Sequence, residues 1–143
     1  MAQQPARRNS PEAITQGLAG RTIALVGLSS RPDSPSYEVA QYLQQHGYRI
    51  IPINPRESEV LGERAYPSLR EAPPGIDVVD VFRRPDAVPA IVEEAIAIGA
   101  PLLWLQLGVV NEEAAARADS AGMTVVMDRC MHIEHSLRAA MPR

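Results

Sequence analysis

Five short apolar segments separated by helical segments constrain the fold of this chain more than any other feature. The apolar segments are 22–26, 48–53, 77–82, 102–105 and 123–127. Apolar strands that alternate with helices are typical of a parallel sheet covered on both faces. We therefore predict an α/β fold: a Rossmann-like open parallel sheet of about five strands, with helices on both faces in three α/β/α layers. The strand order expected for such a sheet is 3-2-1-4-5.

Helical spacing of apolar residues fills the segments between the strands. It predicts helices at 37–46, 86–98, 112–120 and about 130–139. Asn111 is expected to be an N-cap, because an oxygen acceptor and two acidic residues there suit the positive end of a helix. Residues 56–76 form a longer excursion between the second and third strands. We expect residues 1–15 to form a flexible arm and residues 16–143 to form a single domain.

Composition excludes several classes of protein. A chain of 143 residues is long enough to bury a core without disulfides or metals. Its net charge of −3 gives no basic field for nucleic acid or a membrane surface, and no apolar run approaches the roughly 20 residues of a membrane span. All 14 basic residues are arginine, which excludes reactions that need a lysine amine. The single cysteine, Cys130, is typical of a cytoplasmic protein.

The turn after the first strand is suited to phosphate binding. It contains Gly27, Ser29, Ser30 and Arg31. Gly27 permits a positive φ and lets an anion approach the backbone. Ser34 or Ser36 can cap the following helix, whose N-terminus attracts anions. The turn does not complete the G-x-G-x-x-G pattern, so it argues against the commonest dinucleotide sites.

The ends of the later strands add further candidate ligand groups, because ligands of open parallel sheets bind outside the carboxyl ends of the strands. The second strand ends in Asn54-Pro55-Arg56, where an NAD site would have an acidic residue. A basic residue there suits a phosphorylated ribose, either the 2′-phosphate of NADP or the 3′-phosphate of coenzyme A. The expected edge also carries Arg83, Arg84, Gln106 and Gly108, so four arginines converge on it.

Candidate catalytic groups are few. Cys130, His132 and His135 lie near the start of the last helix. They lack the number and spacing of a zinc site. A reactive thiol remains an alternative to a buried cysteine with surface histidines. Asp77 and Asp80 flank the third strand, where turn or cap roles are favoured over an acid–base pair.

Six motifs in order at the strand ends indicate a family resemblance. They are 23–29, 47–55, 61–62 with 66–69, 77–83, 103–108 and 128–130. On these motifs, residues 21–137 resemble the small stand-alone CoA-binding proteins of bacteria and archaea (YccU-like). They also resemble the CoA-binding domain of the succinyl-CoA synthetase α subunit. The synthetase's second domain, with its phosphorylated histidine, has no counterpart here, so we expect no ligase activity from this chain alone.

The resemblance implies that coenzyme A lies across the sheet edge. The pyrophosphate would lie at the first turn and the helix near Ser36, and the adenosine beside Asn54 and Pro55. Arg31 or Arg56 would meet its 3′-phosphate, and the pantetheine would follow Phe82 and Arg83. The predicted cofactor-binding residues are Gly27, Ser29, Ser30, Arg31, Ser36, Asn54, Pro55, Arg56, Phe82, Arg83, Gln106 and Gly108.

The function expected on these grounds is that of a cytoplasmic module that binds CoA or a short acyl-CoA and is not an enzyme. Two alternatives are a small NADP-dependent oxidoreductase and a subunit or regulator of an acyl-CoA ligase-type complex. Either a homo-oligomer or a separate protein partner is compatible with the sequence. In a regulatory role, Cys130 would form a mixed disulfide with CoA if it faces the pocket.

Overall fold

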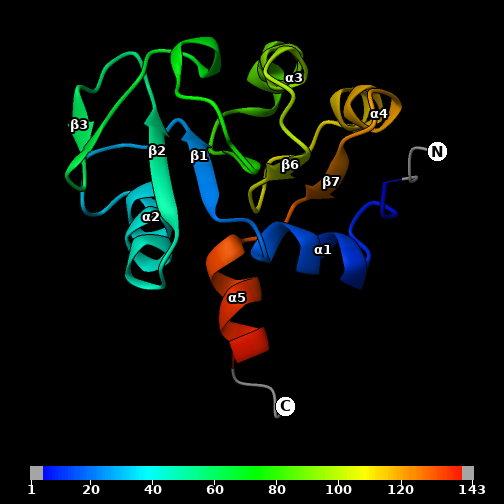
Figure 1. The fold of residues 1–143 in the computed structure, drawn as a ribbon, viewed down its shortest axis with the longest axis horizontal. Coiled ribbons are helices and arrows are strands. Elements are labelled where there is room, and N and C mark those ends of the chain that lie inside the picture. Colours follow the sequence, from blue (N-terminus) through cyan, green and yellow to red (C-terminus); the bar gives the residue numbers. More distant parts are fainter. Residues whose placement is uncertain (1–4, 140–143) are drawn as a thin grey trace.

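The computed structural model describes residues 5–139, and its centre is a five-stranded parallel sheet between two layers of helices (Figure 1). The strands of this sheet are β1 (Thr22–Val26), β2 (Arg49–Ile53), β5 (Val78–Val81), β6 (Leu102–Leu105) and β7 (Thr124–Met127). The helices are α1 (Pro11–Leu18), α2 (Pro35–Gln45), α3 (Val88–Ala97), α4 (Glu112–Ser120) and α5 (Met131–Ala139). Two short antiparallel strands, β3 (Glu59–Val60) and β4 (Glu63–Arg64), and the 3-10 helices Leu69–Glu71 and Pro85–Ala87 complete the described elements.

The helices cover the two faces of the sheet as the sequence predicts. Helices α3 and α4 pack on one face, and α1, α2 and α5 pack on the other (Figure 1). Trp104, on β6, is fully buried in the second layer, and its indole N–H donates to the Arg129 carbonyl at 2.9 Å. Within residues 5–139, no helix has both the length and the apolar character that crossing a bilayer requires. The prediction of a three-layer α/β sheet is therefore confirmed.

The predicted strand order, in contrast, is wrong. The order is β2-β1-β5-β6-β7, so the third long strand lies beside β1 and not beyond β2. The excursion after β2 explains the difference, because Tyr66 already occupies the outer side of that strand. The Tyr66 N–H donates to the Pro52 carbonyl, and its own carbonyl accepts from the Asn54 N–H. With that side taken, β5 pairs with the open side of β1.

A flexible arm was expected over residues 1–15, of which residues 1–4 lie outside the described residues, and residues 11–15 differ from it. Helix α1 begins at Pro11, where the Ser10 hydroxyl accepts from the Ala13 N–H at 3.1 Å. Ala13 and Ile14 are buried against the sheet layer that contains Trp104. The expected domain boundary therefore falls inside a packed helix, because the proline and the serine begin an amphipathic helix instead of an irregular arm.

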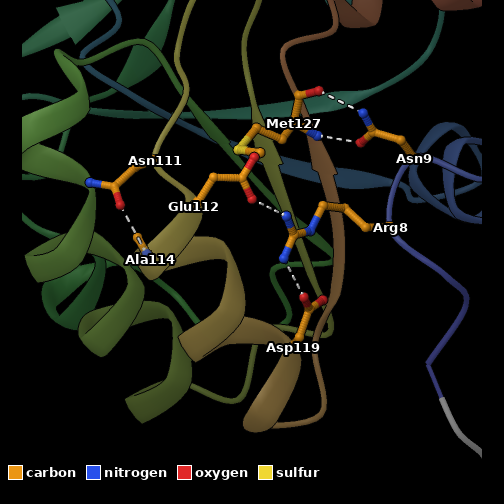
Figure 2. Close-up of polar contacts among 7 residues, drawn as sticks. All are labelled: Arg8, Asn9, Asn111, Glu112, Ala114, Asp119 and Met127. Carbon is orange, nitrogen blue, oxygen red and sulfur yellow. Dashed lines mark hydrogen bonds and ion pairs between the residues drawn. The ribbon is translucent and has the colours of Figure 1, made fainter.

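Two residues before α1 attach the chain to β7 and α4 (Figure 2). The Asn9 side chain donates to the Met127 carbonyl and accepts from the Met127 N–H. The Arg8 guanidinium lies 2.6 Å from a Glu112 carboxylate oxygen and 2.7 Å from one of Asp119. These contacts join segments more than 100 residues apart in the sequence.

The start of α4 is fixed by a predicted cap. The Asn111 side-chain oxygen accepts from the Ala114 N–H at 3.0 Å (Figure 2), which confirms Asn111 as the N-cap. Its amide nitrogen donates to the Pro85 carbonyl at 2.9 Å. The cap thus ties the loop after β6 to the loop after β5, and both loops lie at the carboxyl edge of the sheet.

Candidate functional site

A cavity of about 900 Å³ opens at the carboxyl ends of β1, β5 and β6. In this strand order, the chain reverses its direction across the sheet between β1 and β5, and a crevice forms at such a switch point. The cavity brings together seven of the predicted cofactor-binding residues, namely Gly27, Ser29, Ser36, Phe82, Arg83, Gln106 and Gly108. Ser30, Arg31, Asn54, Pro55 and Arg56 do not line it.

Gly27 closes β1 and brings the loops after β1 and β5 into contact. Its φ is +92°, in the left-handed region, and its N–H donates to the Ile53 carbonyl at 2.8 Å. A Cβ atom here would lie 2.6 Å from the Phe82 carbonyl oxygen, closer than real Cβ atoms come to such an atom. The position therefore requires glycine for both its backbone angle and its close approach.

The backbone N–H groups of the loop after β1 donate to side-chain oxygens of the protein. The Ser29 N–H donates to the hydroxyl of Ser36, which is buried, and the Arg31 N–H donates to the Ser29 hydroxyl. The Ser30 N–H donates to a Glu57 carboxylate oxygen at 2.7 Å. The Glu57 carboxylate thus already accepts from the Ser30 N–H, which is one of the groups predicted to bind phosphate.

Helix α2 begins beside this loop at the cavity wall. Ser34 is its N-cap, and the Ser34 hydroxyl accepts from the Tyr37 N–H at 3.4 Å. Of the two predicted cap residues, the structure thus selects Ser34. The Ser36 hydroxyl lies 2.8 Å from that of Ser34, so Ser36 connects the helix start to the turn. The positive end of α2 consequently faces the predicted phosphate position.

The segment after β2 supports the loop from one side. The Asn54 side chain donates to the Leu28 carbonyl at 3.0 Å and accepts from the Arg56 N–H at 2.9 Å. Pro55 and Arg56 are exposed, and Pro55 lines a separate hollow of about 270 Å³ together with Arg83. Asn54 is therefore bonded within the protein, whereas Arg56 is exposed and does not line the cavity.

The four predicted arginines divide into two pairs. Arg83 and Arg84 line the cavity, and Arg84 lies 3.6 Å from a carboxylate oxygen of Asp86. Arg31 and Arg56 lie outside the cavity lining. The Arg31 guanidinium lies 3.2 Å from Asp33, and both side chains are about three-quarters exposed. Two arginines thus supply positive charge to the cavity directly.

The ends of β6 and β7 form the opposite wall. The Gly108 N–H donates to an Asp128 carboxylate oxygen at 2.7 Å, so this donor is already used within the protein. The Gln106 side chain is only 7% exposed, and its oxygen has no hydrogen-bond partner among the described residues. A buried amide oxygen without a partner is energetically unfavourable until a donor reaches it. Gln106 thus lines the cavity and carries a buried oxygen that can still accept a hydrogen bond.

Sequence reasoning missed the apolar part of the site. Val39, Leu107, Val109 and Ile133 line the cavity. Leu107 is 58% exposed and Ile133 is 48% exposed, which is unusual for large aliphatic side chains around a hollow. The available signal was the apolar residues Leu107, Val109 and Val110 in the turn after β6. Cys130, which is not among the predicted cofactor-binding residues, also lines the cavity.

The two aspartates that were expected to flank the third strand differ sharply in their surroundings, because Asp77 precedes β5 and Asp80 lies within it. A carboxylate oxygen of Asp77 accepts from the Arg21 and Thr22 N–H groups, which is the turn role that the sequence favours. Asp80 is fully buried between Leu25 and Trp104, its partners in the neighbouring strands, and neither carboxylate oxygen has a partner among the described residues. Burial raises the pKa of Asp80 well above its ordinary value.

The three histidines of the chain gather around one tyrosine between α2 and α5. The Tyr42 ring stacks on His46 and His132, and the Tyr42 hydroxyl lies 2.7 Å from His135 Nδ1. Burial, followed by the proximity of His46 and His132, lowers the pKa of His135. Within residues 5–139, no group of three histidine, cysteine, aspartate or glutamate side chains is placed to hold a metal ion. The ring contacts pack the end of α2 against α5, and His132 also lines the cavity.

Comparison with known proteins identifies close relatives over nearly the whole chain. Residues 21–136 match the family described as a CoA binding domain. The Bacillus subtilis protein YneT is 42% identical over 135 residues, which cover 94% of this chain and 98% of that protein. The crystal structure of a PH1109 protein redesigned for binding has a TM-score of 0.90 and 37% identity, and the match covers 96% of this chain and 98% of that chain.

A more limited similarity links the chain to a larger enzyme. The α subunit of an ADP-forming acetate–CoA ligase from Pyrococcus furiosus is 41% identical over 59 residues. The match covers 41% of this chain but only 13% of that subunit. The similarity therefore concerns a small part of the ligase subunit.

Proposed function

Because this chain belongs to the CoA binding domain family, we propose that it binds coenzyme A or a short acyl-CoA in the cavity beside β1 and β5, and that it catalyses no reaction itself. The position of the cavity carries this proposal, because ligands of open parallel sheets bind at the switch point between strands. The cavity combines hydroxyl groups, arginines and an apolar wall. These features match the pyrophosphate and the pantetheine of CoA.

The pyrophosphate is proposed to bind the turn after β1 and the start of α2. The N–H groups of Ser29 and Ser30 donate to Ser36 and Glu57 oxygens, and phosphate oxygens accept from the same kind of donor. A phosphate that replaces the Glu57 carboxylate would keep the Ser30 N–H satisfied. The positive end of α2 and the nearby Arg83 favour the bound negative charge.

The adenosine is proposed to lie beside Asn54 and Pro55, with its 3′-phosphate at Arg56. Arg31 is the other candidate, but its guanidinium is already paired with Asp33. Arg56 forms no ion pair with any described residue, so it can pair with a phosphate without losing another partner. Its backbone is held by Asn54, which fixes the start of the side chain.

The pantetheine is proposed to follow the apolar wall past Phe82 and Leu107 toward Gln106. Phe82 is half-buried, and Leu107 is exposed at the cavity. Burial of this apolar surface favours the ligand by about 25 cal/mol for each Å² covered. The pantetheine contains amide N–H groups, and one of them can donate to the unpartnered oxygen of Gln106.

Thermal unfolding with CoA, dephospho-CoA, NADP and NAD tests the function. CoA at 100 times its Kd should stabilise the fold by about 2.7 kcal/mol. Stabilisation by NADP but not by CoA would instead support the oxidoreductase alternative, and stabilisation by none of them would refute both.

Arg56→Gln tests the position of the 3′-phosphate. The variant should weaken CoA binding by roughly tenfold or more, as loss of a charge-assisted hydrogen bond of about 1.5 kcal/mol implies, and should leave the Kd of dephospho-CoA unchanged. Arg49→Gln is the matched control, because Arg49 is exposed at the opposite end of β2. Equal CoA affinities of the two variants, measured by calorimetry, would exclude Arg56 as the phosphate partner.

The non-catalytic role and a role in a ligase complex make different predictions. The relationship to acetate–CoA ligase subunits supports the second role as an alternative. A binding module would bind CoA and leave acetyl-CoA, ADP and phosphate unchanged when it is incubated with them alone. Formation of acetate and ATP from acetyl-CoA, ADP and phosphate by the isolated chain would contradict the non-catalytic proposal.

A cytoplasmic location is part of the same proposal, because a CoA ligand and a free thiol suit a reducing compartment.

A further inference from the structure

The only cysteine of the chain lies at the cavity and at the start of a helix. Cys130 precedes α5, and its carbonyl accepts from the Glu134 N–H at 2.9 Å as the first bond of that helix. The residue is 9% exposed and lines the cavity together with Phe82 and Gln106. Cys130 therefore belongs to the wall along which the pantetheine is proposed to lie.

A second observation indicates that this part of the cavity accepts a ligand. The Gln106 side chain is more than nine-tenths buried, lines the same cavity and has an oxygen without a hydrogen-bond partner among the described residues. A buried acceptor of this kind requires an N–H or O–H donor. A pantetheine arm supplies amide donors next to a terminal sulfur, so a ligand that satisfies Gln106 also brings sulfur chemistry to this wall.

The remaining walls suit an uncharged arm that ends in sulfur. Val39, Leu107 and Ile133 provide apolar surface, and Arg83 and Arg84 lie on the side of the β5 loop. An arm of low polarity thus fits among the aliphatic side chains while its phosphates remain beside the arginines. Glutathione lacks both the phosphates and the long uncharged arm, so the site should distinguish between the two thiols.

We propose that Cys130 is a modification site that undergoes thiol–disulfide exchange with a bound pantetheine-type disulfide, represented by CoA disulfide. This inference rests on the proposed function. The Cys130 thiol loses its proton, and the resulting thiolate attacks one sulfur of the ligand disulfide. A new bond forms between Cys130 and one CoA, the original sulfur–sulfur bond breaks, and the other CoA leaves as a thiolate that takes up a proton. The number of disulfides is unchanged, so CoA disulfide is the only oxidant required.

The exchange would convert a reversible ligand into a covalent one. The bound CoA would then stay in the cavity until another thiol attacks the mixed disulfide and restores Cys130. The site would accordingly record the ratio of CoA disulfide to CoA in its surroundings. This is a regulatory property that reversible CoA binding does not provide.

The test measures the rate of modification by mass spectrometry of the intact protein without reductant. CoA disulfide and glutathione disulfide are supplied separately at about 0.1 mM. CoA should attach to the protein roughly tenfold faster than glutathione, because a bound ligand presents its disulfide at an effective concentration in the millimolar range. Adenosine 3′,5′-bisphosphate, which lacks a thiol, should slow attachment of CoA but not that of glutathione. Gln106→Leu, which removes the acceptor but keeps Cys130, should also slow only the CoA reaction.

A parallel titration with CoA in the presence of reductant distinguishes the possible failures. Reversible CoA binding combined with equal rates for the two disulfides, or with no attachment at all, would overturn the role of Cys130 and leave the proposed function intact. Absence of reversible CoA binding would refute the proposed function and, with it, this inference. Attachment of CoA that the bisphosphate does not slow would show that the thiol reacts from solution, which also overturns the inference.

Discussion

The buried carboxyl group of Asp80 should make the stability of the protein depend on pH in a direction opposite to that of a typical aspartate. Replacing it with asparagine keeps the shape of the side chain and removes the titrating proton. The pKa of Asp80 is raised well above 3.8 by burial, and neither of its oxygens has a partner among the described residues. The folded protein therefore holds this proton at pH values where the unfolded chain has already released it.

The size of the effect follows from proton linkage. Below the ordinary pKa of aspartate, which applies to the unfolded chain, Asp80 is protonated in both the folded and the unfolded state and adds no pH dependence. Above it, the unfolded state binds one proton fewer than the folded state, so the free energy of unfolding falls by about 1.4 kcal/mol for each pH unit. The fall continues until the pH reaches the folded-state pKa. The free energy of unfolding of a whole domain is typically 5–15 kcal/mol, so the loss over one pH unit is already measurable.

Urea denaturation at several pH values between about 4.5 and 7.5 measures this difference. The free energy of unfolding of Asp80→Asn minus that of the wild type should rise with pH at the slope given above. Asp80→Val, which places an aliphatic side chain among apolar neighbours, should show the same slope with a different offset. Parallel pH profiles of the wild type and both variants would refute the assignment of a protonated carboxyl group in the core.

Two further substitutions test the N-terminal contact and the turn after β1. Asn9→Ala removes both side-chain hydrogen bonds to Met127 and should lower the free energy of unfolding by about 1–3 kcal/mol; unchanged urea denaturation would show that this contact does not stabilise the fold. Gly27→Ala combines a φ of +92° with a Cβ atom 2.6 Å from the Phe82 carbonyl oxygen. It should lower stability by more than about 1 kcal/mol and weaken CoA binding measured by calorimetry, whereas wild-type values for both would contradict the required close approach.

Local sequence signals predicted the five strands of the parallel sheet, the helices α2 to α5 and several of their ends. The apolar segments become the buried strands because each is covered on both faces, and Asn111 caps α4 through its own side chain. The location of the site at the strand ends follows from the parallel sheet itself. Gly27 was identifiable because a tight turn between a strand and a helix has few alternatives to glycine.

Interactions between distant segments explain what the sequence did not predict. The place of β5 depends on Tyr66, which occupies the outer side of β2, and no local pattern at Tyr66 indicates this contact. Likewise, Arg8 finds its carboxylate partners more than 100 residues away. Long-range contacts of this kind follow from the assembled sheet and not from short motifs.

The contacts made by Asn9 and Tyr66 have a consequence for how copies of this protein can associate. Outer strands of an open sheet expose backbone groups that can pair with a strand from another molecule. Here the side chain of Asn9 bonds both backbone groups of Met127 on β7 (Figure 2). The Tyr66 backbone bonds the outer side of β2 near its end, at Pro52 and Asn54. An incoming strand would have to displace one of these segments before it could extend the sheet. Association through helix surfaces or loops meets no such barrier, so the two contacts protect the protein against edge-to-edge aggregation.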